Sequence, residues 1–135
     1  MPSTNNTDLI TCPTSAGELL DKLSILEIKS EKIIQEDKLI NIKNELQVLT
    51  KVKNNSINYD STVSDYFNKL KEINIKLWTI EDDIRDCERN KDFSNTFIQL
   101  ARAVYKTNDV RAAIKKEINL YLGSNIVEEK SYQDY

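Results

Sequence analysis

The sequence predicts an all-α fold: a long antiparallel helical hairpin within a small helical bundle. Helix breakers are scarce, because the chain of 135 residues has only two Gly and two Pro, which all lie near its ends. Between them, apolar residues recur at steps of three and four, the spacing of an amphipathic helix. A chain of this length suits a single domain.

Three parts follow from this pattern. Residues 1–14 form a polar N-terminal segment, residues 15–123 a helical bundle domain, and residues 124–135 a polar C-terminal tail. Ser15 is expected to begin the first helix, because Ser15 and Glu18 have the spacing of a capping box.

The first part of the domain is predicted to be helical over residues 15–52, as one long helix or as two nearly collinear ones. Asp37 is expected either to cap the second of these or to lie in a bend. Residues 53–60 are rich in Asn and Ser and are predicted to form the main internal loop.

Two further helices are predicted over residues 61–89 and 94–122. The first has a coiled-coil-like apolar pattern and an expected length of roughly 40 Å at about 1.5 Å per residue. The turn between them is short, so the two helices should be antiparallel neighbours. Asp92 or Ser94 is expected to cap the second, and Gly123 to end it in the left-handed conformation.

Composition excludes several classes of function. The net charge is −3, so the chain as a whole has no positive potential that would attract nucleic acid. No histidine is present for a catalytic triad or a histidine-ligated metal. The two cysteines, Cys12 and Cys87, form neither a disulfide framework nor a zinc-binding spacing. No signal peptide or membrane-spanning run is evident, so we expect a cytoplasmic protein with no cofactor and no membrane contact.

An acidic block lies in the segment 81–89, where five carboxylates are interrupted by Arg85 and Arg89. Helical pyrophosphohydrolases bind Mg²⁺ with similar spacings, but such pairs also arise by chance in a charged helix. We favour a solvated face over a metal site. The bases Arg102 and Lys106 are expected to pair with this acidic end of the hairpin.

The candidate ligand-binding residues are polar positions on the predicted apolar faces of the hairpin, except for Asp109, which flanks them about 100° round the helix. They are Asn74, Asn108, Asp109, Arg111 and Lys115. One interpretation is a buried polar layer that fixes helix register. The other is a site for an anionic ligand, with Arg111 as the anchor because its guanidinium binds carboxylate or phosphate in a forked geometry. Trp78 lies beside the apolar stripe of the predicted helix 61–89. It is either a packing residue of the bundle or a binding hot spot for a protein partner.

Four segments carry a resemblance. They are residues 15–23, 77–82, 107–113 and 128–132. In combination they resemble a family of short, uncharacterised helical proteins of bacteria and phages, a domain of unknown function. The resemblance implies a helical single-domain protein and supplies no activity.

Two hypotheses of function remain, and neither names a reaction, so enzymatic activity stays undecided. The first is a non-enzymatic protein-interaction or scaffold module, expected to be a homodimer paired through the apolar face of its long hairpin near Trp78. The second is a small-ligand-binding protein or enzyme that acts on a phosphorylated or carboxylated substrate through Asn108, Arg111 and Lys115.

Overall fold

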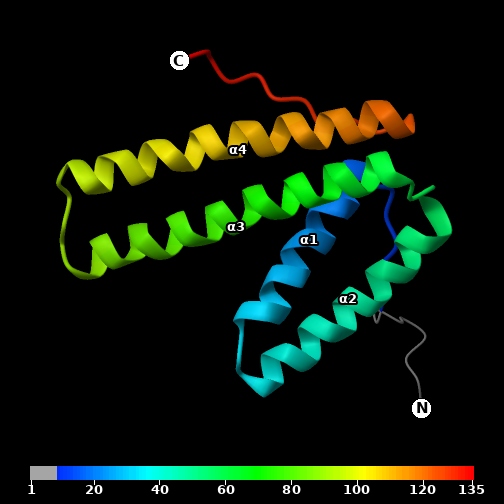
Figure 1. Cartoon of the computed structure of the whole chain (residues 1–135), viewed down its shortest axis with the longest axis horizontal. Coiled ribbons are helices and arrows are strands. Elements are labelled where there is room, and N and C mark those ends of the chain that lie inside the picture. The colour runs from blue at the N-terminus through cyan, green and yellow to red at the C-terminus, as the bar shows by residue number, and fades with distance from the viewer. Residues whose placement is uncertain (1–8) are drawn as a thin grey trace.

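The computed structural model describes residues 9–135, and within them it contains helices and connecting segments but no strand. The helices are α1 (Ala16–Lys32), α2 (Glu36–Ser56), α3 (Ser61–Arg89) and α4 (Asn95–Leu122). The all-α prediction is confirmed. Helices α3 and α4 form the expected long antiparallel hairpin, and α1 and α2 lie across one half of it (Figure 1).

The prediction for the first helical segment is wrong in one respect. It forms neither one helix nor two collinear ones, because α1 and α2 fold back on each other as a second hairpin (Figure 1). Ile33 and Gln35 have extended backbones, which reverse the chain. Gln35 is the N-cap of α2, and Asp37 lies in its first turn. Apolar residues recur at steps of three and four in both helices, so the periodicity continues across the turn and does not reveal it.

The internal loop is shorter than predicted, because α2 continues through Ser56. The Ile57 N–H group bonds the Lys53 carbonyl at 2.9 Å, and the Ile57 side chain packs against the core. This apolar contact fixes the last turn of α2 although Asn and Ser residues favour other conformations.

Side-chain and backbone caps define the other helix ends. Ser15 Oγ accepts a hydrogen bond from the Glu18 N–H group at 3.1 Å. Asp60 Oδ1 accepts one from Val63 at 2.9 Å, which begins α3. Ser94 is the N-cap residue of α4. Gly123 ends α4 in the left-handed region, with φ 65° and ψ 38°, as predicted.

The core lies where α1 crosses α3 and α4. Its fully buried members include Leu20, Val63, Leu70 and Ile118. The first turn of α1 lies very close to α4, because a Cβ atom on Gly17 would be 2.6 Å from the Lys115 carbonyl oxygen. Only glycine fits this crossing without displacement of a helix.

The far half of the α3–α4 hairpin projects beyond α1 and α2 (Figure 1). We call residues 78–106 the arm. Of its apolar residues only Ile80 and Cys87 are buried, whereas Phe93 and Ile98 are 52% and 50% exposed. The two helices of the arm therefore leave much of their apolar surface exposed to solvent.

Candidate functional site

A buried carboxylate lies at the centre of the polar cluster. Asp21 of α1 is 1% exposed. Its Oδ1 atom accepts hydrogen bonds from Asn74 Nδ2 of α3 and Arg111 Nε of α4, each at 2.9 Å, and its Oδ2 atom bonds Arg111 Nη2. Asn74 also donates to Ser24 Oγ at 2.8 Å. The cluster thus joins three helices through one forked Arg–Asp pair.

Lys115 borders this cluster and is itself surrounded by carboxylates. Its Nζ atom lies 2.7 Å from Glu18, 3.2 Å from Glu128 and 4.0 Å from Asp21. Burial lowers the pKa of Lys115, but the hydrogen bonds to Glu18 and Glu128 outweigh burial and raise it overall. The bond to Asp21 raises the pKa of Arg111. Both cations are therefore held in the charged state by carboxylates of the chain.

The five candidate ligand-binding residues do not form one site. Asn74, Arg111 and Lys115 converge on Asp21. Asp109 instead faces the C-terminal tail, where its carboxylate accepts a bond from the Tyr135 hydroxyl at 2.7 Å. Asn108 lies between the two regions and lines cavities on both sides.

Sequence reasoning missed Asp21 as the partner of Arg111. A signal was present, because Asp21 lies between the buried Leu20 and Leu23 and shares a helical stripe with Gly17 and Ser24. A carboxylate on an apolar stripe requires a buried partner. The partner is 90 residues away in sequence, so only the tertiary structure identifies it.

A groove of about 520 Å³ opens beside the cluster, between α1 and the α3–α4 hairpin. Trp78 lies on its wall together with Ile25 and Ile28 of α1. Arg111 and Arg85 also face it, and each is paired with a carboxylate, Asp21 and Glu81 respectively. We call this groove the notch. The charges of its two arginines are already neutralised by carboxylates of the chain.

Two carboxylates of the acidic block, Glu81 and Asp86, are paired within α3 itself. Arg85 binds Glu81, and Arg89 binds Asp86. The expected pairing across the hairpin is wrong, because Arg102 and Lys106 make no ion pair within residues 9–135. Arginines one turn away on α3 pair with Glu81 and Asp86, whereas Asp82 and Asp83 make no ion pair within residues 9–135. In the described part of the chain, no three Cys, Asp or Glu side chains converge as a metal site would require.

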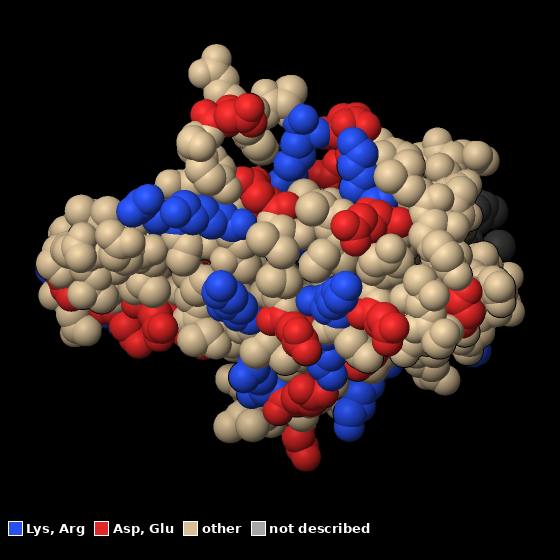
Figure 2. Space-filling view, turned by 45° about the horizontal axis from the view of Figure 1, so that its top comes forward, with Lys and Arg blue, Asp and Glu red and all other residues tan. Residues whose placement is uncertain are grey.

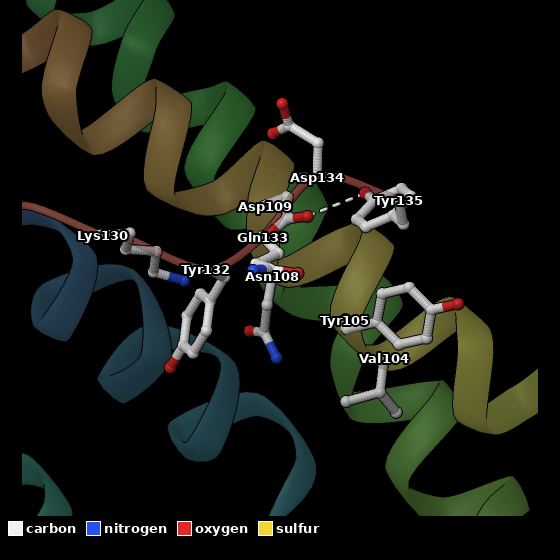
Figure 3. A pocket seen from close by; sticks show the side chains of 9 residues that line it. All are labelled: Val104, Tyr105, Asn108, Asp109, Lys130, Tyr132, Gln133, Asp134 and Tyr135. Carbon is white, nitrogen blue, oxygen red and sulfur yellow. Dashed lines mark hydrogen bonds between the residues drawn. The ribbon is translucent and has the colours of Figure 1, made fainter.

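A cavity of about 710 Å³ lies between α4 and the C-terminal tail. We call it the tail pocket. Figure 3 shows Tyr132 of the tail on one side of Asn108, and Val104 and Tyr105 of α4 on the other. The rings of Tyr105 and Tyr135 pack edge to face at 5.2 Å. No sequence pattern pointed to this pocket, because its walls come from a helix and an extended segment.

Comparisons place the chain in a family without naming an activity. No helix of the described residues is both long and apolar enough to cross a membrane. No curated protein and no solved structure is significantly similar to the chain. One family model, described as a family of unknown function (DUF6165), matches residues 10–135. The chain, with its Asp21–Arg111 pair and projecting arm, belongs to this family of unknown function, DUF6165.

Proposed function

We propose that this protein is a non-enzymatic interaction module that pairs with a second copy of itself through the arm. The observation that carries the proposal is the contrast in burial along one hairpin. Where α1 covers it, Val63, Leu70 and Ile118 are 0% exposed. In the arm, the seam residues Phe97 and Leu100 remain partly exposed. Pairing two such hairpins would complete a four-helix core.

Charge complementarity supports a second copy as the occupant. The arm has acidic residues on α3 and basic residues on α4 (Figure 2). Asp82 and Asp83 are exposed and make no ion pair within residues 9–135, and the same holds for Arg102 and Lys106. In a two-fold dimer the contacts occur twice, so the α3 acids of each copy can meet the α4 bases of the other.

An anionic ligand at Asn108, Arg111 and Lys115 is the weaker hypothesis. Arg111 binds Asp21 through two atoms, and Lys115 binds Glu18 and Glu128. An incoming anion would have to displace these carboxylates, one of which is buried. The cluster is better suited to hold α1, α3 and α4 in register, although a buried ion pair is weak evidence for added stability.

Sedimentation velocity tests the pairing. We expect a species of twice the monomer mass at micromolar concentration. The emission of Trp78, the single tryptophan of the chain, should shift on dilution because Trp78 is the first residue of the arm on α3. A monomer throughout the micromolar range, with unchanged Trp78 emission, would contradict the proposal.

A charge exchange tests the geometry. The double variant Arg102→Glu, Lys106→Glu makes both helices of the arm acidic, and Asp82→Lys, Asp83→Lys makes its α3 surface basic. Each variant alone should be monomeric through like-charge repulsion, whereas an equimolar mixture of the two should restore the dimer.

The control is Lys38→Glu, Lys43→Glu, which makes the same charge change on the exposed surface of α2 and should leave the dimer intact. Failure of the mixture to associate would eliminate this pairing. The same holds if the α2 control dissociates as the arm variants do.

A further inference from the structure

The tail pocket has aromatic walls on two separate segments. Tyr105 comes from α4 and Tyr132 from the tail, and Figure 3 shows them on opposite sides of Asn108. Tyr132 is 81% exposed and Tyr135 is 76% exposed. The volume of about 710 Å³ lies within the usual range for small-ligand sites, roughly 300–1,000 Å³.

The charge in this pocket differs from that of the polar cluster. Within residues 9–135, Asp109 makes no ion pair, and its carboxylate accepts a hydrogen bond from Tyr135 at 2.7 Å. That bond raises the pKa of Tyr135, because the protonated hydroxyl is the hydrogen-bond donor to the carboxylate. Asp21, by contrast, is bound by Arg111. Asp109 is thus a carboxylate beside aromatic rings with no base bound to it in the described chain.

Aromatic faces attract cations through their quadrupole, and a nearby carboxylate strengthens that preference. The chain already contains such a contact at the pocket wall, because Lys130 Nζ lies 5.6 Å from the centre of the Tyr132 ring. Asn108 and Gln133 add side-chain amides, whose oxygen atoms accept hydrogen bonds and whose NH₂ groups donate them. The lining has two carboxylates, Asp109 and Asp134, against one base, Lys130, so it favours a positively charged ligand with apolar substituents.

We propose that the tail pocket binds a small organic cation, whose alkylammonium group lies between Tyr105 and Tyr132 with Asp109 as its counter-ion. Quaternary ammonium compounds and polyamines share this chemistry. The proposal uses residues of one protomer and does not rest on self-association.

Titration with choline and with spermidine, followed by the tyrosine ring resonances in NMR spectra, tests the proposal. At least one of them should bind saturably, with a Kd of about 1 mM or tighter. A compact site will favour choline, and an extended site along α4 will favour spermidine. Dimethylbutanol, the neutral carbon isostere of choline, should bind at least about fivefold more weakly because it lacks the charge.

Variants locate the binding. Asp109→Asn and Tyr105→Leu should each weaken cation binding about fivefold or more, because each removes one part of the cation site. Asp83→Asn is the matched control, since Asp83 is an exposed carboxylate on α3 that lines none of these cavities, and binding should not change. Circular dichroism should show unchanged helix content in all three, because Asp109 and Tyr105 lie outside the core.

Three outcomes would overturn the proposal. They are no saturation by either cation, equal binding of dimethylbutanol and choline, and equal losses in Asp83→Asn and Asp109→Asn. The charge-exchange variant Asp82→Lys, Asp83→Lys separates the two proposals, because it should lose the dimer and keep the cation site. Deletion of residues 132–135 should abolish binding by removing one wall.

Discussion

At the scale of single residues, the contact between α1 and α4 depends on the missing side chain of Gly17. Its N–H group donates to Asn119 Oδ1 at 2.7 Å, and an added Cβ would meet the Lys115 carbonyl oxygen at 2.6 Å. Gly17→Ala should therefore destabilise the protein by about 1–3 kcal/mol. Helix propensity alone predicts the opposite sign, a gain of about 1 kcal/mol. Urea unfolding decides between them, and a more stable variant would contradict the close approach.

Asp21 illustrates the cost of a buried charge. Asp21→Asn keeps the shape of the side chain but leaves Arg111 half-buried without its carboxylate. We expect a loss of about 3–5 kcal/mol in the free energy of unfolding, the usual result of breaking a buried pair. The double variant Asp21→Leu, Arg111→Met should regain at least half of the loss, because it removes both charges. Equal losses in Asp21→Asn and in the double variant, measured in urea, would show that the unpaired charge of Arg111 is not the source of the loss.

At the scale of elements, α3 begins at Asp60, a capping carboxylate whose ionisation contributes to the stability of the fold. Hydrogen bonds from Tyr121 first, and then from the Val63 amide, lower the pKa of Asp60 below its ordinary 3.8. Near that pH the unfolded chain therefore binds more protons at Asp60 than the folded chain does. The stabilising contribution is complete above pH 3.8 and is lost as the pH falls through the folded-state pKa.

This linkage can be measured by comparing melting temperatures. Between about pH 5 and about pH 3, wild type should lose Tm more steeply than Asp60→Asn, since Asn keeps a cap but does not titrate. Asp65→Asn, at an exposed position of α3 beyond the cap, serves as the control and should follow wild type. Parallel Tm curves for wild type and Asp60→Asn would refute the assignment.

At the scale of the whole molecule, stability should decrease away from the three-helix crossing. Helix α2 buries only Ile42, and the arm buries only Ile80 and Cys87 among its apolar residues. Hydrogen exchange should be slowest in the stretches around Val63–Leu70 and Ile114–Asn119, and faster in α2 and in the arm. If the arms pair, protection in the arm alone should rise with protein concentration. Uniform protection along all helices would contradict this gradient.

The sequence by itself determined the elements of this protein. Scarce Gly and Pro and the three-and-four apolar spacing are local properties, and they predicted the bounds of α3 and α4 almost to the residue. The caps at Ser15 and Gly123 followed from local backbone chemistry in the same way. Net charge and the absence of histidine limit the chemistry too, because composition is the same whatever the fold.

Only the tertiary structure decided how these elements meet. The reversal between α1 and α2 was hidden, because a helical period is the same on both sides of a turn. The partners of Arg111 and of Asp109 lie on α1 and on the tail, distant in sequence, and pairing across such distances leaves no periodic signal. Burial of Asp21 required Arg111 nearby, and only the crossing of α1 over α4 brings them together.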